Sequence, residues 1–166
     1  MPEKETLERA REDAREGRSP STQAGEFVKE EMDHIREGKH GARSTTQAIA
    51  IGLSKARRAG VKLAPPKKGT SSAATRTKAE RDLKKGRKPA KKKSAKRSHA
   101  VEGALKREGH SAASRASLSK QAKQAASKRS SAARSQSARK AARTKGAAER
   151  SAAARKAART RERRAA

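Results

Sequence analysis

The chain of 166 residues contains no cysteine, tryptophan or tyrosine, and Phe27 is its single aromatic residue. The lack of cysteine excludes a disulfide framework and a thiolate metal site. The lack of aromatic rings argues against RNA-binding modules that stack unpaired bases on such rings. No stretch approaches 18 apolar residues, so we expect no transmembrane helix. The charged N-terminus also lacks the apolar core of a secretory signal, so a cytoplasmic protein is expected.

Large apolar side chains are scarce and unevenly distributed. Leu, Ile, Val, Phe and Met together number 15, and nine of them lie between Phe27 and Leu63. Only four lie in residues 64–166. Burial stabilises by roughly 25 cal/mol per Å² of apolar surface, whereas ordering one residue costs about 1–2 kcal/mol. We therefore expect residues 64–166 not to fold alone.

Charge divides the chain at the same place. The formal net charge is +29, from 46 basic and 17 acidic residues. Residues 1–63 carry 13 basic and 11 acidic side chains, whereas residues 64–166 carry 33 and 6, and Pro65-Pro66 marks the join. The fold class predicted is mostly α plus disorder. Its parts are a charged N-terminal segment (1–20), a helical hairpin module (21–63) and a long disordered basic tail with transient helices (64–166).

The periodicity of the central segment predicts two helices. In the first, at residues 23–37, an apolar face has the spacing i, i+4 and i+7, and a glycine follows the last turn. In the second, at residues 45–59, Ser44 and Gln47 have the spacing of a capping box, and Gly60 follows. A short loop joins the two helices, so we predict an antiparallel αα-hairpin. The facing apolar stripes are Val28, Met32 and Ile35 on the first helix, and Ile49, Leu53 and Ala56 on the second.

The basic tail carries the strongest functional indication. ARKAART occurs at 138–144 and again at 154–160, and residues 84–97 form a dense basic run. Clustered Lys and Arg neutralise phosphates and release counterions, which predicts nucleic-acid binding with little base preference. The nucleic-acid-binding residues predicted are Lys84, Lys85, Arg87, Lys88, Lys91, Lys92, Lys93, Lys96, Arg97, Arg139, Lys140, Arg143, Arg155, Lys156 and Arg159.

Other kinds of site are not indicated by the sequence. The four histidines, His34, His40, His99 and His110, show no i, i+3 or i, i+4 spacing among themselves, so we expect them to be solvated and predict no metal site. No phosphate-binding glycine loop and no nucleophile–base pair is recognisable. We therefore expect no enzymatic activity, no cofactor and no small-molecule substrate. The amphipathic basic segments lack the large apolar residues that membrane-surface helices bury, so no membrane partner is expected.

The central segment also resembles a known family. STTQAIAIGLSKARRAG, residues 44–60, is similar to small bacterial proteins of unknown function that share a QAIAI-x-LS-x-ARRAG core, and residues 25–44 resemble that family's first helix. The resemblance spans roughly residues 25–63 and implies a bacterial source, but no activity. The Lys/Ala/Ser-rich tail is similar in composition to linker-histone and bacterial histone-like tails.

The function expected is that of a non-enzymatic, histone-like, nucleoid-associated protein that binds or condenses DNA through its tail. One alternative is a basic protein associated with RNA or the ribosome, because phosphate contacts do not distinguish the two nucleic acids. Another is a protein-interaction or self-association module at residues 21–63, localised by the tail.

Overall fold

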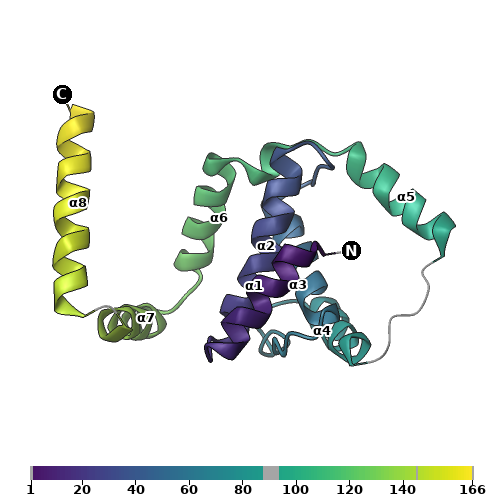
Figure 1. Cartoon of the computed structure of the whole chain (residues 1–166), viewed down its shortest axis with the longest axis horizontal. Coiled ribbons are helices and arrows are strands. Elements are labelled where there is room, and N and C mark those ends of the chain that lie inside the picture. Colours follow the sequence, from purple (N-terminus) through teal and green to yellow (C-terminus); the bar gives the residue numbers. More distant parts are fainter. Residues whose placement is uncertain (1, 88–93, 145, 166) are drawn as a thin grey trace. The chain divides into compact units, whose positions relative to one another are not determined.

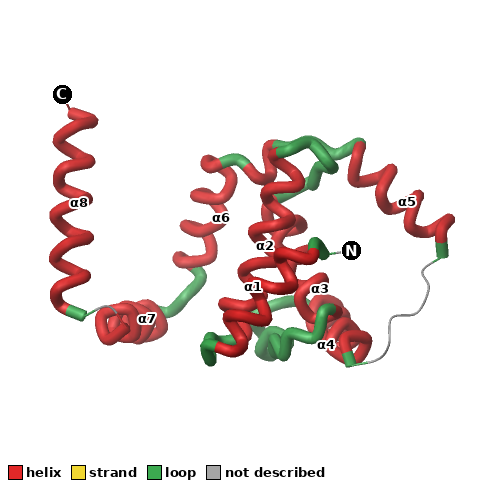
Figure 2. Tube along the Cα trace, in the orientation of Figure 1, coloured by secondary structure: helices red, strands yellow, loops and turns green. Residues whose placement is uncertain are grey.

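The described part of the chain is helical. The computed structural model describes residues 2–87, 94–144 and 146–165 (Figure 1). In these ranges the regular structure consists of eight α-helices and one 3-10 helix, without a strand (Figure 2). Contacts divide the chain into two units, Met1–Gln121 and Ala122–Ala166. None of the helices described is long and apolar enough to cross a membrane.

The first unit contains most of the elements. They are α1 (Lys4–Arg15), α2 (Pro20–Arg36), α3 (Thr45–Arg58), α4 (Ala73–Gly86), α5 (Ala95–Lys106), the 3-10 helix η1 (Ser111–Ala113) and the first half of α6 (Arg115–Ser127). Helix α2 packs against α1 and α3, and α3 packs against α4 (Figure 1). The second unit contains the remainder of α6, α7 (Ser131–Thr144) and α8 (Ala147–Ala165).

Local sequence signals determine the ends of α2 and α3. Pro20 occupies the first turn of α2, which therefore begins three residues before the predicted start, and α2 and α3 each end one residue before the predicted end. At α3 the Ser44 hydroxyl accepts from the Gln47 N–H (3.2 Å), and the Gln47 side chain accepts from the Arg43 N–H (3.0 Å). Gly38 and Gly60 follow the two helices with φ of 75° and 99°, as left-handed C-terminal residues.

Two apolar clusters lie between these helices and their neighbours. The first surrounds Ile35 and includes Met32, Ala42 and Ala48, with Val28 and Ile49 packed against it. The second surrounds Phe27, with Ala10 and Leu7 of α1 on one side and Ala56 of α3 on the other. Phe27 and Ile35 are fully buried. The predicted apolar stripes of α2 and α3 are therefore divided between two clusters, and α1 contributes to the second of them.

Gly52 allows α2 and α3 to approach closely. A Cβ atom at this position would lie 2.7 Å from Val28 Cα and 3.0 Å from the Phe27 carbonyl oxygen. Both are backbone atoms, so they cannot move aside by side-chain rotation. The helical pattern of the sequence did not indicate this role for Gly52.

Replacing Gly52 with alanine is expected to destabilise the first unit. The added methyl group separates the two helices and disturbs packing around Phe27, at a cost of about 1–3 kcal/mol for overpacking. Urea unfolding followed by circular dichroism measures this loss. Gly25→Ala on α2 is the matched control, because nothing lies within 4 Å of its added Cβ and helix propensity favours alanine. Equal stability of the Gly52 variant and the wild-type chain would contradict the close approach.

Residues far along the predicted tail complete the first cluster. Ala112 and Ala113 of η1 are buried in it, and Leu118 of α6 packs against it. The Gly41 N–H donates to the Leu105 carbonyl (2.9 Å), and the Ala42 N–H donates to the Gly109 carbonyl (3.1 Å). Further bonds run from the Thr45 hydroxyl to the Ala112 carbonyl (2.7 Å) and from Arg36 Nε to the Ala113 carbonyl (3.1 Å). The turn between α5 and α6 is thus attached to the α2–α3 loop.

The predicted fold class, mostly α plus disorder with a long disordered tail, is wrong. About three-quarters of the described residues are helical, and the described part of residues 64–166 forms five α-helices and η1. Two physical features were undervalued. Alanine has the highest helix propensity, and Ser72 and Ser130 accept hydrogen bonds from first-turn N–H groups of α4 and α7. Buried alanines also supply core surface that a count of Leu, Ile, Val, Phe and Met leaves out.

The second unit is formed by solvated helices. No described residue between 122 and 163 is buried. The two copies of ARKAART fall on separate helices, α7 and α8, rather than on one continuous helix. Their helicity therefore rests on alanine-rich composition, with the Ser130 cap at α7, rather than on a packed core.

Candidate nucleic-acid interface

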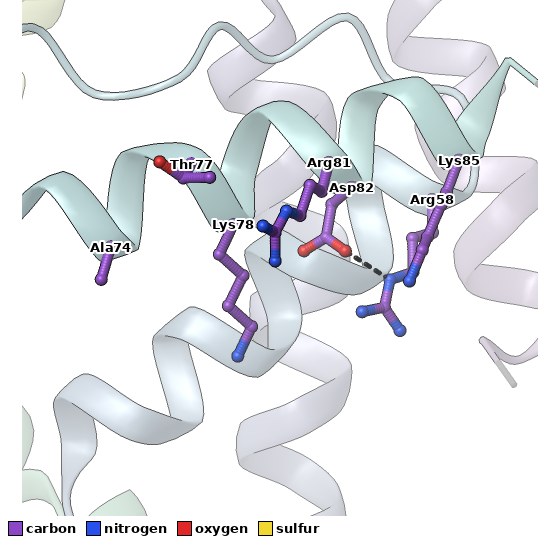
Figure 3. A pocket seen from close by; sticks show the side chains of 7 residues that line it. All are labelled: Arg58, Ala74, Thr77, Lys78, Arg81, Asp82 and Lys85. Carbon is purple, nitrogen blue, oxygen red and sulfur yellow. Dashed lines mark hydrogen bonds and ion pairs between the residues drawn. The ribbon is translucent and has the colours of Figure 1, made fainter.

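A cationic hollow lies between the end of α3 and one face of α4 (Figure 3). Helical spacing places the α4 members on one side of that helix, because positions 74, 77/78, 81/82 and 85 recur about once per turn. Four of the seven lining residues are basic and one is acidic. They are Arg58 from α3, and Ala74, Thr77, Lys78, Arg81, Asp82 and Lys85 from α4.

Asp82 fixes the position of α4 on α3. It is buried, and its two carboxylate oxygens accept from the Ser54 hydroxyl (2.6 Å) and Arg58 Nε (2.7 Å). Both partners come from the last turns of α3. Close approach at Gly86 adds to this attachment, since a Cβ there would lie 2.1 Å from the Arg57 carbonyl oxygen. Asp82 is therefore saturated by α3 and orients Arg58 at the edge of the hollow (Figure 3).

The other three cations of the hollow are not paired with a carboxylate in the described part of the chain, since Asp82 bonds to α3 instead. Lys78, Arg81 and Lys85 are exposed and make no ion pair or side-chain hydrogen bond there. Three like charges on one helical face repel one another, and an anion between them would offset this repulsion. The hollow therefore has the charge to accept a phosphate group.

Of the predicted binding residues that the structure describes, one lies in this hollow. Lys85 lines it, whereas Lys84 and Arg87 are exposed nearby at the end of α4. Lys96 and Arg97 are exposed in the first turn of α5. Lys88, Lys91, Lys92 and Lys93 lie outside the described residues.

The remaining predicted residues belong to the second unit, and all are exposed. Helix α8 presents a continuous cationic face along an open groove, with Glu162 as its acidic member; the lining residues are Ala152, Arg155, Lys156, Arg159, Glu162 and Arg163. Arg139, Lys140 and Arg143 lie together near the end of α7.

Sequence reasoning missed Arg58, Lys78 and Arg81. The signal was present, since Lys78, Arg81 and Lys85 follow the spacing i, i+3 and i+7 on an α4 that begins at Ala73. The density of basic residues along the sequence does not show this face, because α4 contains fewer consecutive cations than residues 84–97.

A second charged cluster is buried between α2 and α3. Lys55 Nζ lies 3.1 Å from Glu30 Oε1 and 2.7 Å from Glu31 Oε2, and the side chains of both glutamates are at most 2% exposed. The Glu3 N–H also donates to Glu30 Oε2 (3.1 Å). One lysine, Lys55, faces two buried carboxylates, so these three side chains together carry a net negative charge.

The pKa values of Glu30 and Lys55 favour the charged forms of these two side chains. Burial by itself raises the pKa of Glu30, but hydrogen bonds from Thr6 and Lys55 outweigh it and the pKa is lowered. Burial by itself lowers the pKa of Lys55, but the adjacent carboxylates of Glu31 and Glu30 outweigh it and the pKa is raised.

The prediction that all four histidines are solvated is wrong for two of them. The side chains of His34 and His40 are 13% and 15% exposed. One ring nitrogen of each lies within 4.8 Å of the other and of a Glu31 carboxylate oxygen. The prediction considered only the spacing between histidines. It did not consider Glu31, which stands three residues before His34 on α2.

Comparison with known proteins finds similarity in the central segment of the chain. No curated protein and no solved structure matches the chain. The segment that matches holds α2 and α3, and it excludes α1, α4 and every helix after α4. Residues 20–68 match the model of a family of unknown function, DUF6496.

Proposed function

We propose that this protein is a non-enzymatic nucleic-acid-binding protein that contacts the phosphate backbone with little base preference. The observation that carries the proposal is the hollow between α3 and α4, where Lys78, Arg81 and Lys85 share one helical face and form no ion pair in the described part of the chain. Duplex DNA carries one negative charge per about 1.7 Å of axis, so several cations on one face can contact successive phosphates.

The exposed cations of α5, α7 and α8 offer further phosphate contacts. They make contact possible over a longer stretch of backbone than the hollow alone covers. The chain has one aromatic residue, Phe27, and it is buried in the core. No Phe, Tyr or Trp ring is therefore available to stack on unpaired bases, which favours duplex over single-stranded partners. A histone-like role at the bacterial nucleoid follows as part of the same proposal.

A charge-removing variant tests the hollow. The triple substitution Lys78→Gln, Arg81→Gln and Lys85→Gln removes three cations while leaving Asp82 and its bonds to α3 in place. If all three contact phosphates, affinity for a random-sequence duplex falls at least roughly tenfold at 0.1 M salt, and the slope of log K against log salt becomes shallower by about 2.7. Fluorescence anisotropy on the full-length chain measures both quantities.

The matched control removes the same charge elsewhere in the first unit. Arg11, Arg15 and Lys29 are exposed on α1 and α2, and they make no ion pair in the described part of the chain. Replacing these three with glutamine lowers the net charge equally. Equal losses in the two triple variants would mean that only overall charge matters and would reject the hollow as a site. A structured RNA offered at the same salt separates a DNA-binding role from a ribosome-associated one.

A further inference from the structure

The end of α2 and the loop that follows it bring together Glu31, His34 and His40. Glu31 and His34 stand one helical turn apart on α2, and His40 returns from the loop after Gly38. One potential ligand atom from each residue lies within 4.8 Å of the other two. The His34 and His40 rings meet edge to face with centroids 6.0 Å apart.

Glu31 supplies a buried oxygen that no described group satisfies. Its side chain is 1% exposed, and neither carboxylate oxygen has a hydrogen-bond partner of good geometry in the described part of the chain. Oε2 lies 2.7 Å from Lys55 Nζ, so the ammonium group compensates its negative charge. Oε1 instead faces His40 Nε2 at 3.4 Å. A buried carboxylate oxygen without a donor is costly, which calls for a cation or a proton at this position.

The spacing and the surrounding hydrogen bonds fit a metal ion. Two ligand atoms of a tetrahedral Zn²⁺ with bonds of about 2.0–2.1 Å lie about 3.3 Å apart, close to the 3.4 Å between Glu31 Oε1 and His40 Nε2. His40 Nδ1 lies 3.1 Å from the Gly41 carbonyl, and His34 Nε2 lies 2.8 Å from Glu3 Oε1. Such outer carbonyl and carboxylate partners orient imidazole ligands and raise their basicity.

We propose that Glu31, His34 and His40 form a binding site for a divalent transition-metal ion of the zinc type. Two imidazoles and one carboxylate suit Zn²⁺ and its first-row neighbours, whereas Mg²⁺ and Ca²⁺ prefer all-oxygen sites. The fourth position of a tetrahedral ion is open to water. The ion neutralises the negative charge left by Glu30, Glu31 and Lys55, and it joins α2 to the loop that bonds to the α5–α6 turn.

Metal titration of the full-length chain tests the proposal. Zn²⁺ added to chelator-treated protein is expected to bind at one ion per chain in calorimetry, and Co²⁺ is expected to give absorption bands of a four- or five-coordinate ion. Mg²⁺ should not compete. Loss of a residue that only hydrogen-bonds to a metal ligand typically lowers metal affinity roughly 10- to 100-fold. Glu3→Gln should lower the affinity for Zn²⁺ within that range, whereas His34→Ala and His40→Ala should each lower it further.

Two further measurements distinguish a metal site from a simple ion pair between protonated His40 and Glu31. His99→Ala, at an exposed position of α5, should bind Zn²⁺ like the wild-type chain. Zn²⁺ should raise the thermal unfolding midpoint of the wild-type and His99 chains, but not that of the His40 variant, which circular dichroism should show to be folded. If Zn²⁺ fails to bind, or binds equally to the His34 and His40 variants, the proposal is wrong and the ion pair alone accounts for the cluster.

Discussion

Replacing Lys55 with methionine is expected to lower the free energy of unfolding by about 3–5 kcal/mol at pH 7, the usual cost of removing one partner from a buried ion pair. The variant leaves Glu30 and Glu31 buried next to each other without the ammonium that lies 3.1 Å and 2.7 Å from them. Methionine keeps the volume of the lysine stem, so the loss reports charge rather than packing. Urea unfolding at pH 7 measures it.

The dependence on pH identifies the cause. In the wild-type chain the lowered pKa of Glu30 gives stability that is complete above its ordinary value of 4.5 and is lost as the pH falls through the lower folded value. The raised pKa of Lys55 gives stability that is complete below 10.5 and is lost as the pH rises through the higher folded value. Without Lys55, Glu30 loses one of the partners that lower its pKa, so the defect of the variant should shrink as the pH falls below about 5.

Two controls accompany this measurement. Lys29→Met, at an exposed position of α2 next to Glu30, should change stability by less than about 0.5 kcal/mol. Adding Glu30→Gln to the Lys55 variant removes one of the unpaired charges and should restore part of the loss. A defect that is equally large at pH 4 and pH 7 would contradict the account of the buried cluster.

A chain ending at residue 68 is expected to be far less stable than one ending at residue 121, although it contains the whole segment that matches DUF6496. The shorter chain lacks Ala112, Ala113 and Leu118 from the first cluster. It also lacks the carbonyl acceptors for the Gly41 and Ala42 N–H groups, the Thr45 hydroxyl and Arg36 Nε. At about 1 kcal/mol for each hydrogen bond, these four alone cost about 4 kcal/mol.

Urea unfolding of the two chains measures the difference. The chain ending at residue 121 should unfold cooperatively, because it retains α4, η1 and the start of α6. The chain ending at residue 68 also loses Asp82, the buried partner of Ser54 and Arg58. Similar unfolding midpoints would show that the α2–α3 pair is an independent fold and that the attachment of the later residues contributes little.

The local features of α2 and α3 could be predicted because neighbouring residues determine them. Ser44, Gln47 and Gly60 act within one turn of the helix end that they cap, so their spacing in the sequence is sufficient. The attachment of residues 105–113 to the α2–α3 loop could not be predicted in this way. It depends on backbone hydrogen bonds and on small alanines more than sixty residues away, and neither leaves an apolar pattern in the sequence.

The candidate sites show the same limit. The positive charge of the tail could be predicted from composition, but the hollow required knowledge that Asp82 docks α4 onto Arg58 and Ser54. The cluster of Glu31, His34 and His40 required the turn at Gly38 to bring His40 back toward α2. Each candidate site depends on the position of a loop or helix in the folded chain, and the periodicity of a single sequence does not specify that position.

The salt dependence of duplex binding by the full-length chain tests the proposed function most directly. The measurement is the affinity for a random-sequence DNA duplex, determined by anisotropy between about 50 and 300 mM salt. If about ten of the cations contact phosphates, log K should fall with log salt at a slope near −9, with little difference between unrelated sequences. A slope near zero, or binding confined to one sequence, would contradict the proposal that this protein binds DNA through contacts between exposed cations and phosphates.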